Sequence, residues 1–200
     1  TVIRDTRPSP ADDERGRGLN AARDEDSGYP SSLTLRRSLI DQATETGVAV
    51  HGSEATIEAS VITATRPRAS DLTFGRGLAV TSHLEEPSFV SLSGSRIADN
   101  HDLGISLQGS AITIDGVLVH DTLPRASDGR FGRGVNLQAS PLAQVIRWSR
   151  IEKNRDMGLY AWATSVDIAA TVVADTEPRE LDALFGDGVV VDQAEATLTG

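Results

Sequence analysis

The sequence has no cysteine, few aromatic residues and no long apolar run, and each shortage excludes a class of protein. Without cysteine, the chain can form no disulfide, no thiol nucleophile and no cysteine-ligated metal site. Its apolar stretches fall well short of the ~20 residues that a membrane-spanning helix needs, so we expect no membrane insertion. Aromatic residues make up only 4% of the chain, so aliphatic side chains must build its core.

Positive charge is also in short supply. The 200 residues include 19 Lys and Arg against 29 Asp and Glu, which gives a net charge of −10. Nucleic acid and anionic membranes would repel so acidic a surface, and we expect neither as a partner.

A repeat runs through the whole chain. A glycine followed by an alternating pattern recurs at intervals of 24 to 30 residues. We call these the phase glycines: Gly18, Gly47, Gly77, Gly104, Gly134, Gly158 and Gly188. The first and third residues after each glycine are apolar, as in Val48 and Val50, whereas the second and fourth are mostly polar or small. Such alternation is typical of a strand with one face turned inward.

Each repeat contains a second stretch with apolar residues and a small polar column. The column consists of Ser38, Ser60, Ser95, Ser149 and Thr171, with Val117 as the exception. A unit this short cannot bury its apolar face alone and needs neighbours stacked on both sides. The sequence therefore predicts an all-β solenoid of about seven coils.

Two segments of the repeat identify a family likeness. Residues 95–100 (SRIADN) precede 104–107 (GISL), and residues 149–154 (SRIEKN) precede 158–159 (GL). This pattern resembles the right-handed parallel β-helix repeat family, the pectate-lyase-like superfold, and it points to no specific enzyme subfamily. The resemblance implies a right-handed parallel β-helix that occupies residues 1–200 as a single domain.

The ends of the chain carry no recognisable polar cap, and both fall within a repeat unit. Uncapped coils expose strand edges that pair readily with other strands. We therefore expect a segment of a longer solenoid, or end-to-end packing of the uncapped coils on a partner.

Longer loops should occur on every second coil, at residues 7–17, 66–76, 123–133 and 177–187, and form a ridge along one side. At the end of each of these loops, Arg17, Arg76, Arg133 and Asp187 occupy equivalent positions, so they should form one column along the stack. We expect these arginines to form ion pairs with carboxylates of the loops, namely Asp13, Asp71, Asp128 or Asp182. In the short coils, Asn100 and Asn154 are predicted to adopt left-handed turns.

No motif identifies a catalytic or metal-binding residue. The Gly-Arg-Gly motifs lack the rest of a dinucleotide or phosphate-loop fingerprint, and they fit tight corners in which glycine supplies a positive φ. The residue sets of β-helix polyuronide hydrolases are absent, and Asp12-Asp13 is an isolated pair. His51, His83, His101 and His120 lack metal-ligand spacing. Calcium stays an open cofactor, because β-helix lyases use it and Asp24–Gly28 faintly resembles a calcium loop, but without the later ligands.

The clearest departure from the repeat is an outward pair of aromatic residues. Tyr160 and Trp162 should lie beside Asn136 and Gln138 of the preceding coil, with Gln108 one coil further along. Flat rings flanked by amides suit a sugar, which has both apolar faces and hydroxyl groups. The alternative is that a neighbouring loop covers both rings.

These observations favour a non-catalytic β-helix scaffold or recognition module. Its partner would be a polysaccharide or another protein, and glycan binding would use the outward aromatic residues. The resemblance and the absence of cysteine imply an exported or cell-surface protein. The alternative function is a polysaccharide lyase or glycoside hydrolase whose site lies here or in coils outside this sequence.

Overall fold

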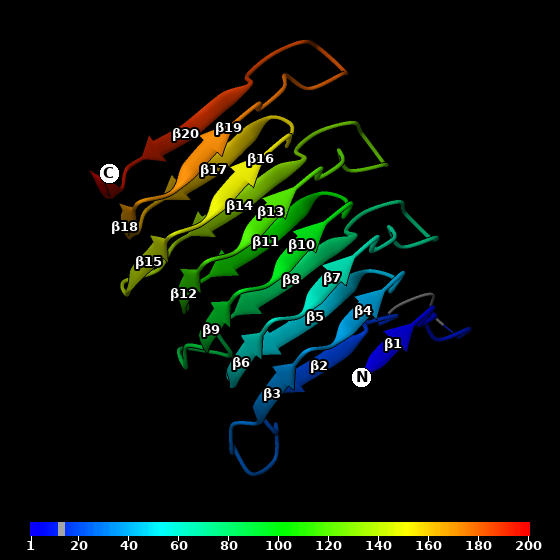
Figure 1. Ribbon diagram of the computed structural model, residues 1–200. Coiled ribbons are helices and arrows are strands. Elements are labelled where there is room, and N and C mark those ends of the chain that lie inside the picture. The colour runs from blue at the N-terminus through cyan, green and yellow to red at the C-terminus, as the bar shows by residue number, and fades with distance from the viewer. Residues whose placement is uncertain (12–14) are drawn as a thin grey trace.

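The computed structural model describes residues 1–11 and 15–200, and it forms a right-handed parallel β-helix (Figure 1). Three parallel sheets of seven strands each run along the solenoid, which confirms the predicted all-β fold of about seven coils. The described residues include no helix, and therefore none that could span a membrane. Each coil contributes one strand to each sheet in turn, and we name the sheets A, B and C in that order.

Sheet A consists of three-residue strands. Along the stack they are β1 (Val2–Arg4), β4 (Leu39–Asp41), β7 (Val61–Thr63), β10 (Arg96–Ala98), β13 (Leu118–His120), β16 (Arg150–Glu152) and β19 (Val172–Ala174). Sheet B contains the strands that begin near the phase glycines. These strands are β2 (Leu19–Ala22), β5 (Thr46–His51), β8 (Arg76–Thr81), β11 (Leu103–Gln108), β14 (Arg133–Gln138), β17 (Met157–Trp162) and β20 (Asp187–Asp192).

Sheet C closes each coil with a five-residue strand. Its strands are β3 (Ser32–Arg36), β6 (Glu54–Glu58), β9 (Phe89–Ser93), β12 (Ala111–Asp115), β15 (Ala143–Arg147), β18 (Ser165–Ala169) and β21 (Glu195–Thr199). The connections from sheet C to sheet A are short, and this corner adopts a left-handed backbone at Arg37, Gly94 and Trp148. Trp148 is 70% exposed there.

The core is a set of aliphatic columns in which like residues lie over like residues. In sheet B, Leu78 pairs with Ile105, and Ile105 pairs with Val135. All three side chains are fully buried. These three residues therefore point inward as predicted, whereas Val191 in the last coil is 42% exposed. Branched aliphatic side chains stack well on such a pleated surface.

The phase glycines are required by close backbone contact. A Cβ atom on Gly104 would lie 2.7 Å from the carbonyl oxygen of Gly134 and 2.9 Å from Thr122 Oγ1. The preceding coils repeat this contact, because a Cβ on Gly77 would lie 2.6 Å from the Gly104 oxygen. The positive φ expected in the Gly-x-Gly corner occurs at its first glycine, as in Gly75 (φ 97) and Gly132 (φ 93).

Buried side chains link the coils where the sheets turn. The amide N–H of Ser38 donates to Ser60 Oγ at 3.1 Å, and the N–H of Ser60 donates to Ser95 Oγ at 3.1 Å. Similarly, Asn100 Oδ1 accepts from the N–H of Thr65 at 3.1 Å, and Asn154 is its counterpart two coils later. These bonds satisfy buried backbone groups that would otherwise be costly to bury.

The predicted left-handed turns at Asn100 and Asn154 are wrong. The left-handed residues are the preceding ones, Asp99 (φ 55) and Lys153 (φ 53). Both asparagines are instead fully buried and bind the previous coil. The sequence does not indicate this role, because the backbone N–H that each asparagine side chain accepts belongs to a residue more than 30 positions away.

The long connections occur on every second coil, between sheets A and B, and lie on one side of the stack, as predicted (Figure 1). Neighbouring long loops touch, since the N–H of Ser127 donates to the carbonyl oxygen of Leu72 at 3.0 Å. Asp12 and Asp13 lie outside the described residues.

We expect Gly104→Ala to lower the free energy of unfolding by about 2–3 kcal/mol, because the new methyl group overlaps buried backbone. Gly94→Ala is the matched control. Gly94 has open space around its Cβ position, and Ala59 holds the same left-handed conformation one coil earlier. Gly94→Ala should therefore cost only the ~1 kcal/mol of a left-handed alanine. Urea unfolding measures both. Equal losses for the two variants would contradict the close-contact explanation.

Candidate functional site

The predicted aromatic and amide residues lie together on the outer face of sheet B. Asn136 pairs with Tyr160, and Gln138 pairs with Trp162 and with Gln108. Parallel strands lie ~4.8 Å apart, so the side chains on β11, β14 and β17 follow one another along the solenoid axis. The structure thus brings together the five residues that the sequence grouped.

Two of these five residues belong to a cluster centred on Arg133. The Arg133 guanidinium lies 4.3 Å from the centroid of the Tyr160 ring, and its Nη1 donates to Asn136 Oδ1 at 2.9 Å. The Tyr160 hydroxyl donates to Asp192 Oδ2 at 3.2 Å. Burial and this hydrogen bond raise the pKa of the Tyr160 hydroxyl. Tyr160 and the buried Asn136 therefore support the face, and Arg133 covers one side of the Tyr160 ring.

Gln108, Gln138 and Trp162 remain as the outward-facing groups. Gln108 is exposed, while Gln138 and Trp162 are partly exposed. Within residues 1–11 and 15–200, none of the three makes a side-chain hydrogen bond. Beside them, Gln108 and Gln138 line a hollow of about 140 Å³ under the long loop that contains Phe131.

The arginine column forms ion pairs with different partners from those predicted. Arg76 Nε lies 2.9 Å from Asp102 Oδ2, and Arg133 Nε lies 2.6 Å from Asp156 Oδ2. Arg17 similarly pairs with Glu45 at 3.3 Å. These acidic residues lie in the short turn of the following coil, where Asp102 and Asp156 are almost completely buried.

The loop carboxylates bind arginines of their own loops. The pairs are Arg68 with Asp71, Arg125 with Asp128 and Arg179 with Asp182. Asp13, the partner predicted for Arg17, lies outside the described residues. The prediction paired each arginine with a carboxylate of its own loop. In the stacked coils, a carboxylate of the next coil lies nearer to the guanidinium group.

Each Phe that precedes a Gly-x-Gly motif contacts at least one arginine, and Phe185 contacts Arg179. Arg125 and Arg133 lie 4.6 and 5.0 Å from the centroid of the Phe131 ring, and Phe74 has an equivalent pair. Phe131 adopts a left-handed backbone (φ 63), which is unusual for a bulky residue. These cation–π contacts fix each loop against sheet B.

A wider groove lies on the same face nearer the N-terminus. It has a volume of about 520 Å³, and its walls include Arg17, Glu25, His51 and Arg76. His51 Nε2 lies 2.9 Å from His83 Nδ1, and His51 Nδ1 lies 2.8 Å from Thr81 Oγ1. Burial, followed by the electrostatic influence of His83 and Arg17, lowers the pKa of His51. No sequence motif indicates this pair, because its members are 32 residues apart.

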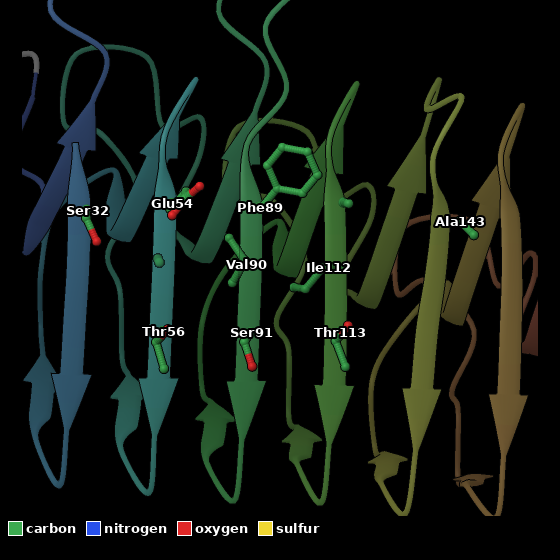
Figure 2. Close-up of a pocket in the computed structure, with 11 residues that line it drawn as sticks. Ser32, Glu54, Thr56, Phe89, Val90, Ser91, Ile112, Thr113 and Ala143 are labelled. Carbon is green, nitrogen blue, oxygen red and sulfur yellow. The ribbon is translucent and has the colours of Figure 1, made fainter. Parts of the chain in front are cut away.

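A separate hollow of about 370 Å³ lies on the outer face of sheet C. Figure 2 shows Thr56, Ser91 and Thr113 at one level on β6, β9 and β12, with the Phe89 ring above them. Phe89 is 49% exposed, and Glu54 is its register partner on β6. Sequence analysis missed this surface because Phe89 follows a loop of irregular length.

The segment that faintly resembles a calcium loop is closed by its own hydrogen bonds. The N–H and the hydroxyl of Ser27 both donate to Asp24 Oδ1, at 2.8 and 2.6 Å. These bonds lower the pKa of Asp24. In the part of the chain that the structure describes, no group of three or more His, Asp or Glu side chains converges on a common point.

Comparison with known protein families, with curated proteins and with solved structures finds no match to this chain. Its architecture and its side chains are therefore the basis for proposing a function.

We expect Arg133→Met to lower the free energy of unfolding by about 3 kcal/mol, because it leaves the Asp156 carboxylate buried without its closest cation. Arg147→Met is the matched control. It breaks an exposed pair with Asp115 and should cost less than about 1 kcal/mol. Adding Asp156→Asn to Arg133→Met should recover part of the loss. A double variant less stable than Arg133→Met would contradict this explanation.

Proposed function

We propose that this chain is a non-catalytic recognition module that binds a polysaccharide on the outer face of sheet B. The observation that carries the proposal is the line of Gln108, Gln138 and Trp162 on three consecutive strands. An indole ring offers a flat apolar surface to the C–H face of a sugar. The two amides supply both donors and acceptors for sugar hydroxyls.

The regular spacing of the strands supports an extended ligand. A linear glycan running along the solenoid axis would meet a new polar side chain on each strand, and its contacts would add along the chain. The net charge of −10 favours a neutral glycan over a polyuronide, because an acidic chain would be repelled.

The carboxylates of this face support recognition over catalysis. A glycosidase needs two carboxyl groups about 5–9.5 Å apart that are available to the substrate. In the turns that lead into sheet B, Glu45, Asp102 and Asp156 are each engaged by an arginine. Asp192 on β20 accepts a hydrogen bond from the Tyr160 hydroxyl. A lyase or hydrolase within the pectate-lyase-like superfold remains the alternative, and release of reducing or unsaturated sugar ends would identify it.

Export to the cell surface is part of the proposal, because structural polysaccharides are found there and the chain has no cysteine that oxidation could damage. Another protein, or a further coil packed end to end, is the competing partner for this face or for the ends of the solenoid.

We expect Trp162→Ala to weaken binding to a neutral polysaccharide at least about tenfold, because the stacking surface is lost. Affinity electrophoresis in gels containing xylan or glucans measures the change. Trp148→Ala, which removes an exposed Trp from another corner, should bind like the wild type. Phe89→Ala tests the hollow on sheet C in the same gels.

Two results would overturn the proposal. One is unchanged retardation of Trp162→Ala in gels that retard the wild type. The other is a wild type that none of these polysaccharides retards. If Phe89→Ala lost binding and Trp162→Ala kept it, the polysaccharide site would lie on sheet C and not on sheet B.

A further inference from the structure

Two histidines from different coils meet at the edge of the groove on sheet B. His51 is the last residue of β5, and His83 lies in the loop that follows β8. Their rings form an edge-to-face pair with centroids 4.8 Å apart and planes at 84°. The atoms in contact are ring nitrogens, His51 Nε2 and His83 Nδ1, at 2.9 Å.

Both histidines are held in place by the surrounding fold. His51 Nδ1 lies 2.8 Å from the hydroxyl oxygen of Thr81, its register partner on β8. When that nitrogen carries the proton and donates to Thr81, the lone pair of Nε2 points toward His83. Backbone bonds in both directions between His83 and Glu86, each 2.9 Å, fix the position of the second ring.

We propose that His51 Nε2 and His83 Nδ1 bind a divalent transition-metal ion such as Zn²⁺, with water completing its coordination. Zinc lies about 2.0–2.1 Å from imidazole nitrogens, so two such ligands on one tetrahedral ion are about 3.3 Å apart. The observed separation is 2.9 Å. To admit the metal in place of the shared proton, the two nitrogens would have to move about 0.4 Å apart, and both rings would have to turn so that their lone pairs meet at the ion.

The contact of His51 Nδ1 with the Thr81 hydroxyl is of the kind that generally orients metal-binding histidines. A metal-ligating imidazole usually donates its other N–H to a fixed oxygen, which sets the tautomer and the ring orientation. Imidazole ligands prefer Zn²⁺, Cu²⁺ and Ni²⁺ over Ca²⁺ or Mg²⁺, which take oxygen ligands. The chemistry of the pair therefore selects the class of metal.

The charges around the pair are nearly balanced. Glu25 lines the same groove, and Glu86 lies in the loop of His83 and pairs with Arg23 at 3.5 Å. Arg17 opposes a cation, but Glu45 and Asn20 engage its guanidinium group. With two protein ligands, the metal would keep open positions that face the groove.

The experiment is a Zn²⁺ titration of protein without a histidine tag, by isothermal calorimetry at pH 7.5 in a buffer that does not bind metal. We expect one equivalent to bind to the wild type. His51→Gln and His83→Gln should each weaken binding at least tenfold, and Thr81→Val should weaken it about tenfold through lost orientation. His101→Gln, whose ring bonds the Pro124 carbonyl oxygen, should match the wild type.

A second measurement covers variants that fail to fold. Substoichiometric Cu²⁺ added to the wild type should broaden the imidazole NMR signals of His51 and His83 before those of His101 and His120. Absence of Zn²⁺ binding by the wild type, equal binding by folded His51→Gln, or uniform broadening of all four histidines would overturn the proposal. These readouts do not depend on polysaccharide binding, so either proposal can fail without the other.

Discussion

At one point in every coil, the backbone passes so close to the next coil that no side chain fits between them. The phase glycines occupy this point, and a Cβ on Gly77 or Gly104 would meet the next glycine's carbonyl oxygen at 2.6 or 2.7 Å. This contact fixes the register of sheet B, because a slip of one residue would place a Cβ there and turn the aliphatic columns outward. The stacked core and the outer face therefore depend on the same constraint.

Given that register, the polar groups inside the turns can form hydrogen bonds with the neighbouring coil. Ser60 and Asn100 accept backbone N–H groups of the preceding coil. The same principle acts on charge at the surface, where Arg133 reaches forward to the buried Asp156. The long loop that contains Phe131 is then held against sheet B by Arg133, which lies over the rings of both Phe131 and Tyr160. The outer face thus combines residues committed to structure with residues turned to solvent.

This division determines how the candidate site should be understood. Of the pair of aromatic residues that departs from the repeat, Tyr160 is tied to Arg133 and Asp192, whereas Trp162 keeps its outward position. Recognition would rest on Trp162 and the two glutamines, with the Arg133 cluster holding their strands in place. The histidine pair at the ends of β5 and β8 offers a different chemistry, because its ring nitrogens converge on each other.

The sequence by itself determined the solenoid, its inward columns, the alternate long loops and the register of Gln108, Gln138 and Trp162. All of these follow from a period that can be counted along the chain. Only the tertiary structure decided the partners of Arg76 and Arg133, the buried role of Asn100, and the meeting of His51 with His83. Those contacts join different coils through side-chain reach and loop shape. A linear period gives the strand that lies next to each residue, but it does not give the atom that each side chain will reach.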